Sequence, residues 1–211
     1  MTGNPVREAI ARLNNRRAPR ENLSQPTLLI LGGSQGAESL NEAVADMLAR
    51  QLPALAGWRI VHQTGASQHE CVSQKYAGFR LTSIVEPFFD NLAEWYACAT
   101  LVISRAGATT LAELACGGCP VILLPYPHAA DNHQLANAKV YESAGAAMIV
   151  EHDRIQSQTV DRLSTAVAVL AQDASRRNAM RHAMRQFARP DAAGDVRQVL
   201  QSVMAGLKNE Y

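Results

Sequence analysis

The sequence has little of several features that mark special classes of protein. Its charge is nearly balanced, with 20 basic and 19 acidic side chains in 211 residues, so it lacks the strongly basic character of nucleic-acid-binding proteins. No apolar run approaches the roughly 18–20 residues that a membrane-spanning helix needs. The first residues show no secretory signal, and four cysteines make no dense disulfide framework. We therefore expect a soluble protein in a reducing cytoplasm that binds no nucleic acid.

What the sequence does contain is a regular alternation of short apolar runs and helical patterns. Six strands are expected, at residues 27–31, 58–62, 79–85, 100–104, 120–124 and 146–150. Helices are expected at residues 35–51, from Asn91 onward, around 111–116, and at 132–143, 156–171, 174–188 and 192–206. This alternation predicts the α/β fold class, with a Rossmann-like, doubly wound parallel sheet covered by helices on both faces.

We divide the chain into three parts on the basis of this pattern. Residues 1–25 are polar and turn-rich and form a connecting segment or linker with one short helix; residues 26–190 form the Rossmann-like domain; residues 191–211 form a C-terminal helix. Sheets of this type bind ligands at the carboxyl ends of their strands. Functional residues are therefore expected just after four strand ends, at Leu31, Val85, Ser104 and Leu124.

The first strand is followed by a glycine-rich turn at residues 32–37, Gly-Gly-Ser-Gln-Gly-Ala. Glycines let backbone N–H groups approach a ligand closely, and the helix that follows offers an N-terminus at which anions bind. The hydroxyl of Ser34 can donate to a phosphate oxygen. Two alternatives remain open: a tight turn without a ligand, or the G-x-S-x-G nucleophile elbow of a serine hydrolase, which normally follows several strands rather than the first.

A second helix start follows the fourth strand, and it carries an acidic residue. Thr109, Thr110 and Glu113 are spaced so that they share one face of this helix. A carboxylate at this place can accept two hydrogen bonds from a vicinal diol, as acidic residues do for ribose in dinucleotide-binding folds. The alternative is that Glu113 only stabilises the helix near its positive end.

The loop after the fifth strand leads into a helix with His133 and Gln134 at its beginning. These donors and acceptors at the sheet edge suit a polyhydroxylated sugar. His128, Asp131 and His133 offer a metal site as an alternative, although their spacing matches no known metal motif.

These pieces, in this order, resemble the C-terminal domain of the MurG family of UDP-N-acetylglucosamine:lipid I N-acetylglucosaminyltransferases. The resemblance extends over nearly the whole chain, at residues 3–7, 32–37, 62–65, 88–90, 105–113, 132–134, 137–138, 143–147 and 190–193. It implies the C-terminal half of a two-domain GT-B glycosyltransferase that binds UDP-N-acetylglucosamine. No cofactor is expected, and the absence of an Asp-x-Asp motif agrees with donor binding without a metal ion.

The resemblance also implies what this chain leaves to the rest of such an enzyme. The N-terminal acceptor domain is expected to be absent here, and with it the lipid I groove, the general base and most of the membrane-binding surface. The full enzyme would work at the cytoplasmic face of the cell membrane. We expect this chain to bind the donor without catalysing transfer alone. Another UDP-sugar enzyme of the same architecture, such as a 2-epimerase, is the alternative, because these motifs mostly recognise UDP.

Carried over residue by residue, the resemblance assigns the nucleotide diphosphate to two parts of the chain. Arg7 and Ser34 would hold the diphosphate, with Gln35 and Gly36 in the same loop. Phe89 would stand where the family reads the uracil edge through its main chain.

The remaining assignments concern the ribose and the sugar. Glu113 would bind the ribose hydroxyls, and His133 and Gln134 would face the sugar. His133 stands where some members of the family carry glutamine. Three further residues would line the nucleotide at the second helix start, namely Ala108, Thr109 and Thr110.

Overall fold

One sheet of six parallel strands forms the centre of the molecule. The computed structural model describes residues 2–15, 25–32, 37–127 and 132–208, and in this part the strand order is β3-β2-β1-β4-β5-β6. The strands are β1 (Thr27–Leu31), β2 (Arg59–Gln63), β3 (Thr82–Glu86), β4 (Leu101–Ser104), β5 (Val121–Leu123) and β6 (Ala147–Ile149). All neighbouring strands pair in parallel, and the order reverses between β1 and β4. The predicted doubly wound, Rossmann-like sheet is confirmed.

Strand β1 shows why the sheet needs cover on both faces. Successive side chains of a strand point to opposite faces. Leu28 and Ile30 lie in one group of buried apolar side chains, which we call the first core layer. Leu29 and Leu31 lie in another, the second core layer. Because both faces of the strand are buried, its sequence reads as a continuous apolar run rather than an alternating one.

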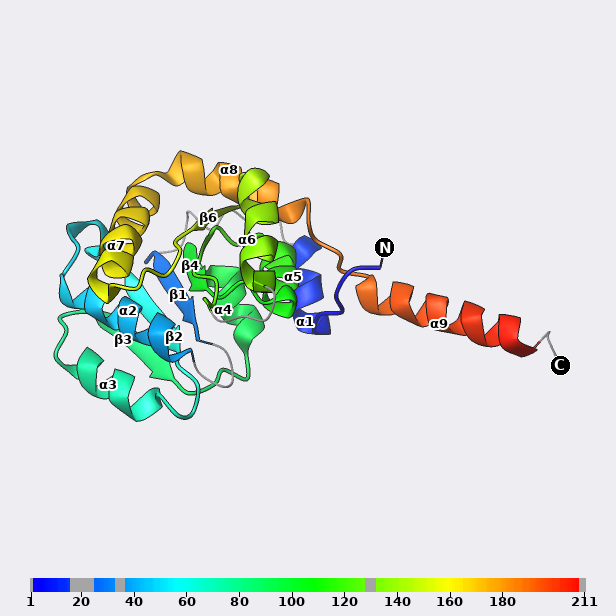
Figure 1. Cartoon of the computed structure of the whole chain (residues 1–211), viewed down its shortest axis with the longest axis horizontal. Coiled ribbons are helices and arrows are strands. Elements are labelled where there is room, and N and C mark those ends of the chain that lie inside the picture. Colours follow the sequence, from blue (N-terminus) through cyan, green and yellow to red (C-terminus); the bar gives the residue numbers. More distant parts are fainter. Residues whose placement is uncertain (1, 16–24, 33–36, 128–131, 209–211) are drawn as a thin grey trace.

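Helices cover the two faces separately (Figure 1). The first core layer is built with α2 (Glu38–Ala49), α3 (His69–Ala77), the 3₁₀ turn η3 (Pro53–Leu55) and α7 (Gln156–Gln172). The second core layer is built with α1 (Glu8–Ala11), the 3₁₀ turn η1 (Arg12–Asn15), α4 (Leu92–Cys98), α5 (Ala108–Gly117) and α6 (His133–Ser143). Helix α8 (Ala174–Arg185) reaches both layers, through Met180 and Met184. Helix α9 (Ala192–Lys208) projects away from the body of the domain (Figure 1).

The sequence patterns anticipated most of these elements within a few residues, but α3 was missed. Only Val72 and Tyr76 of this helix are buried. Two apolar positions do not make the recurring stripe by which an amphipathic helix is recognised. No helix in the described part of the chain is both long enough and apolar enough to span a bilayer.

The connecting segment at the start of the chain lies against the domain. Ile10 of α1 and Leu13 of η1 are buried in the second core layer, and both elements contact α5. This packing brings the residue that precedes α1, Arg7, close to the carboxyl edge of the sheet.

Candidate functional site

Two adjoining cavities lie at the carboxyl ends of the strands, where the strand order reverses. The smaller has a volume of about 190 Å³, and the larger about 950 Å³. Gly32, directly after β1, and Arg105, directly after β4, line both cavities. Ligands of open α/β sheets bind at this point of the fold, and the sequence prediction that functional residues follow Leu31 and Ser104 agrees with this location.

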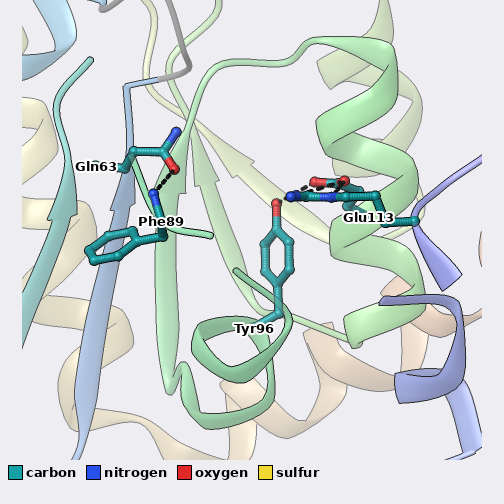
Figure 2. A network of polar contacts seen from close by, with 5 residues as sticks. Gln63, Phe89, Tyr96 and Glu113 are labelled. Atoms are coloured by element: carbon teal, nitrogen blue, oxygen red, sulfur yellow. Dashed lines mark hydrogen bonds and ion pairs between the residues drawn. The ribbon is translucent and has the colours of Figure 1, made fainter. Parts of the chain in front are cut away.

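Glu113 is the buried acid of the smaller cavity (Figure 2), and two side chains pair with it. Glu113 is only 7% exposed to solvent. Arg7 Nε donates to Glu113 Oε1 over 3.2 Å, and Arg7 Nη2 lies at the same distance from the same oxygen. The Tyr96 hydroxyl donates to Glu113 Oε2 over 3.0 Å. A carboxylate has about four acceptor positions, so the hydrogen bonds from Arg7 Nε and Tyr96 leave about two for a ligand.

Tyr96 stays a hydrogen-bond donor under all physiological conditions. It comes from α4 and is completely buried. Burial, and then the negative charge of Glu113, raise the pKa of Tyr96 well above its usual value. The phenol is therefore neutral and donates a hydrogen bond to the carboxylate.

Gly32 shows how closely the backbone approaches at the start of the site. Its N–H donates to the carbonyl of Gln63 over 2.8 Å. A Cβ at position 32 would lie 2.7 Å from Asn41 Oδ1 and 2.8 Å from the Gln63 carbonyl oxygen. The need for glycine thus comes from this close approach of β1 and β2, in addition to any ligand.

Behind Gly32 lies a buried network around His62. His62 Nε2 donates to Asn41 Oδ1 over 3.0 Å, and His62 Nδ1 accepts from the Tyr76 hydroxyl over 2.7 Å. Asn41 Nδ2 in turn donates to the carbonyl of Thr64 over 2.9 Å. Burial lowers the pKa of His62 to about 3, so the imidazole is neutral. This network ties β2 to α2 and α3 on the side of the first core layer.

Phe89 is not among the described residues that line either cavity, and it is linked to the site through its main chain and Gln63. The Phe89 N–H donates to Gln63 Oε1 over 3.3 Å (Figure 2). The ring is buried and packs on Trp95, with centroids 5.4 Å apart. Its neighbour Phe88 is 51% exposed and lines the smaller cavity. A main-chain donor and an aromatic face therefore lie at the end of the cavity formed by the β3–α4 segment.

Arg105 ties the strand ends together between the two cavities. Its guanidinium donates to the carbonyls of Leu124 and Pro125, to Ser39 Oγ over 2.7 Å, and to His152 Nε2 over 2.6 Å. Burial lowers the pKa of Arg105 to about 10, which still leaves it charged at neutral pH. Burial and the Arg105 charge lower the pKa of His152 to about 4, so its Nε2 lone pair is available to accept.

The structure places the other predicted residues differently relative to the cavities. Thr110 lines the smaller cavity, whereas Ala108 and Thr109 are exposed at the start of α5. Gln134 lines the larger cavity and accepts from the Tyr126 N–H over 3.0 Å. His133 begins α6, is exposed, and is not among the described residues that line either cavity.

Some sequence predictions fall outside the described residues. Ser34, Gln35 and Gly36 belong to this group, and so do His128 and Asp131 of the alternative metal site. Within the described ranges, no three histidine, cysteine or acidic side chains come together as a metal site would need.

Four residues of the site were given no role from the sequence. They are Gln63, Phe88, Tyr96 and Arg105. Arg105 directly follows a strand whose end was predicted to carry function, so its position was the available signal. A polar residue at the end of a buried strand was the signal at Gln63, which is 5% exposed. Tyr96 had none, because a tyrosine on a short helix reads as a core residue.

Comparison with known proteins connects this site to one family. Residues 27–196 match the glycosyltransferase family 28 C-terminal domain. A UDP-N-acetylglucosamine--N-acetylmuramyl-(pentapeptide) pyrophosphoryl-undecaprenol N-acetylglucosamine transferase from Desulfotalea psychrophila is 43% identical over 196 residues, which are 92% of this chain and 52% of the relative. The chain thus spans about half the length of this relative.

Solved structures agree with this relationship. The crystal structure of Acinetobacter baumannii MurG matches with a TM-score of 0.74 and 35% identity, over 87% of this chain and 52% of that one. A putative UDP-N-acetylglucosamine 2-epimerase from Listeria monocytogenes, 16% identical with a TM-score of 0.62 over 96% of this chain and 53% of that one, shares the fold alone. The six-stranded parallel sheet is that of the C-terminal half of GT-B glycosyltransferases. The resemblance to the C-terminal domain of MurG is confirmed, and the chain belongs to the glycosyltransferase family 28 C-terminal domain family.

Proposed function

We propose that this chain binds UDP-N-acetylglucosamine and serves as the donor-binding half of a transferase that converts lipid I to lipid II in peptidoglycan synthesis. The observation that carries the proposal is the buried Glu113 carboxylate beside a cavity at the reversal of strand order. In Rossmann-like folds an acidic residue near this point binds the hydroxyls of a ribose. The relatives named above supply the substrate class, since such an enzyme transfers N-acetylglucosamine from UDP-N-acetylglucosamine.

In this proposal the nucleoside occupies the smaller cavity. The ribose hydroxyls donate to Glu113, and the base lies toward Phe88 and the main chain of Phe89. The Phe89 N–H donates to Gln63 Oε1. A carbonyl oxygen of uracil would take over or share this donor.

The diphosphate follows at the start of α5. The first N–H groups of a helix lack partners within the helix and carry a partial positive charge, so they bind anions. Arg7 lies close to α5 through its contact with Glu113, and Ser34, Gln35 and Gly36 follow β1 in the sequence. The sugar would extend into the larger cavity, which Gln134 lines and where His133 begins the neighbouring helix.

The chemistry proposed for the complete enzyme is an inverting transfer. A hydroxyl of lipid I attacks the anomeric carbon of N-acetylglucosamine while the bond to the β-phosphate of UDP breaks. Negative charge grows on that phosphate, and donors that are already in place there stabilise the transition state most. In this proposal such donors are Arg7, the loop with Ser34 and the helix that follows it, together with the N-terminus of α5. The base that takes the acceptor's proton belongs to the other half, at the cytoplasmic face of the membrane, so this chain alone binds the donor without transferring it.

Two alternatives are separated by simple measurements. A UDP-sugar enzyme of another specificity would bind UDP-glucose more tightly than UDP-N-acetylglucosamine. The serine hydrolase interpretation of Ser34 has no support from the family to which the chain belongs. Labelling by a fluorophosphonate that disappears in Ser34→Ala would revive it.

The decisive test is metal-free calorimetry of UDP-N-acetylglucosamine binding to the wild type and to Glu113→Gln. This substitution keeps the shape of the side chain and removes its charge. Loss of a charged hydrogen-bonding partner weakens binding by about 1.5–3 kcal/mol, or roughly 10- to 150-fold. Glu70→Gln, an exposed site on α3, is the matched control and should bind like the wild type. Equal binding by Glu113→Gln and the wild type would refute the proposed site.

A further inference from the structure

The hydroxyl of Tyr96 reaches Glu113 from the second core layer, at the edge of the smaller cavity, which both residues line. The whole residue is buried, and its ring packs in the second core layer. Its hydroxyl lies 3.0 Å from Glu113 Oε2 (Figure 2). A phenylalanine would fill the same space in the core, so packing alone does not account for a hydroxyl at this position.

We propose that Tyr96 is a positioning residue for ribose recognition, which acts by orienting the Glu113 carboxylate. The inference rests on the proposed function, because it presumes a ribose at Glu113. It adds a residue from α4 to a site otherwise assigned to the connecting segment, the strand ends and α5.

The first argument is that Glu113 has only two kinds of anchor in the described part of the chain. One is Arg7, whose side chain is 47% exposed and belongs to the connecting segment. The other is Tyr96, which is fixed within the core. When a nucleotide diphosphate binds, the Arg7 guanidinium gains a second anionic partner, and its hold on Glu113 weakens. Tyr96 is then the anchor that remains.

The second argument concerns direction. A carboxylate can turn about its last bond, and a diol needs both acceptor atoms in a defined plane. The Tyr96 hydroxyl is kept protonated by burial and by the Glu113 charge, which raise its pKa, so it can only donate to Oε2. One oxygen is thereby fixed, which limits the rotation of the carboxylate in the cavity that Glu113 lines.

The third argument is that α4 serves both ends of the nucleoside. The segment between β3 and α4 carries Phe88 and Phe89 at the base end of the cavity, and α4 itself carries Tyr96 at the ribose end. Leu92 and Tyr96 are the buried residues of this helix, so the same packing that places the helix also places the hydroxyl. Base and ribose recognition are therefore set by one rigid element.

The test is the preference for a ribose over a deoxyribose, measured by calorimetry with UDP and 2′-deoxy-UDP on the 211-residue chain. We expect the wild type to prefer UDP, and Tyr96→Phe to reduce this preference roughly three- to tenfold while 2′-deoxy-UDP binds almost unchanged. Tyr76→Phe is the matched control, because it removes another buried and hydrogen-bonded phenol hydroxyl, in the first core layer. It should keep the full preference.

The possible failures are distinguishable. A wild type that binds UDP and 2′-deoxy-UDP equally, or binds neither, overturns the proposed function and this inference with it. A wild type that prefers UDP, together with a Tyr96→Phe variant that keeps the same preference, overturns the role of Tyr96 alone. Should Tyr96→Phe fail to fold, Glu113→Asp is the second variant to measure. It shortens the side chain and so moves the carboxylate away from an intact Tyr96, and it should also lose the preference for UDP over 2′-deoxy-UDP. A preference retained in Glu113→Asp would overturn the inference.

Discussion

Arg7 and Glu113 meet across 106 positions of the chain, and both Arg7 Nε and Arg7 Nη2 lie 3.2 Å from the same oxygen, Glu113 Oε1. Because the Arg7 side chain is 47% exposed, solvent screens this ion pair, and its contribution to stability should be below about 1 kcal/mol. The ion pair matters because it occupies part of the Glu113 carboxylate. Arg7 fills acceptor positions that the hydroxyls of a ribose would need.

The first prediction is that Arg7→Met has opposite effects on two related ligands. Uridine must displace Arg7 from Glu113 and offers it no new partner, whereas UDP offers its diphosphate. We therefore expect uridine to bind about threefold more tightly to Arg7→Met than to the wild type, and UDP to bind roughly tenfold more weakly. Calorimetric titration of both ligands measures the two changes.

Arg12→Met is the control for this experiment. Arg12 lies in the same connecting segment and pairs with Glu8 at the surface, away from the cavities. Its loss should change neither affinity. If Arg7→Met weakens uridine and UDP by the same factor, Arg7 contributes only general attraction, and its occupancy of the ribose positions is refuted.

The second prediction concerns the pH dependence of folding. The pKa of His62 is lowered to about 3 in the folded protein, below the ordinary value of 6.5 that it regains on unfolding. The unfolded chain therefore binds the proton more readily than the folded chain between these values. The stabilisation is fully present above pH 6.5 and is lost as pH falls toward 3, by up to about 1.4 kcal/mol per pH unit.

Urea unfolding of the wild type and of His62→Gln from pH 7 to pH 4 tests this. The variant should be less stable at pH 7, because the contacts with Asn41 and Tyr76 are disturbed, and it should lose less stability on acidification. His182→Gln, at an exposed site on α8, should keep the wild-type slope. His152, whose pKa is lowered to about 4, acts in the same direction and leaves part of the slope in His62→Gln.

The third prediction is that Gly32→Ala destabilises the fold even without a ligand. The added methyl group would lie 2.7 Å from Asn41 Oδ1 and 2.8 Å from the Gln63 carbonyl oxygen, so β1 and β2 must shift. Overpacking of this kind costs about 1–3 kcal/mol. The free energy of unfolding, from urea titration, is the measurement.

Gly194→Ala provides the comparison for a methyl group with free space. Nothing lies within 4 Å of its added Cβ, and the residue is inside helix α9, where alanine is favoured over glycine. Its stability should equal or slightly exceed that of the wild type. A Gly32→Ala variant as stable as Gly194→Ala would show that the backbone at position 32 has room to move.

The fold could be predicted because buried parallel strands and their glycine-bounded ends leave a strong local signal. The strand from Thr27 to Leu31 was predicted at its observed bounds. Both of its faces are buried, and its sequence is accordingly an almost continuous apolar run. Helix α3 escaped detection because only Val72 and Tyr76 face the core. Where a helix touches the domain so sparsely, its sequence carries little of the pattern.

The site likewise combines residues that the sequence could identify with contacts that depend on how distant segments pack. Glu113 was identified by its place on the helix after a strand, and Arg7 through a resemblance to known enzymes; the structure brings the two together. The hydrogen bond from Tyr96 to Glu113 joins residues 17 positions apart on two different helices. Such a contact depends on how the helices pack, and no spacing rule within the sequence reports it.

The sheet itself has a consequence for how this protein can evolve. It separates the two core layers. The His62 network lies on one side of the sheet, and the Tyr96–Glu113 contact lies on the other. Substitutions that lie far apart and share no partners have additive effects. Mutations that tune stability around His62 should therefore accumulate without epistasis toward those that tune nucleotide preference around Tyr96. At the carboxyl edge of the sheet, where Gly32 and Gln63 lie, selection for stability and selection for nucleotide preference would act on the same residues.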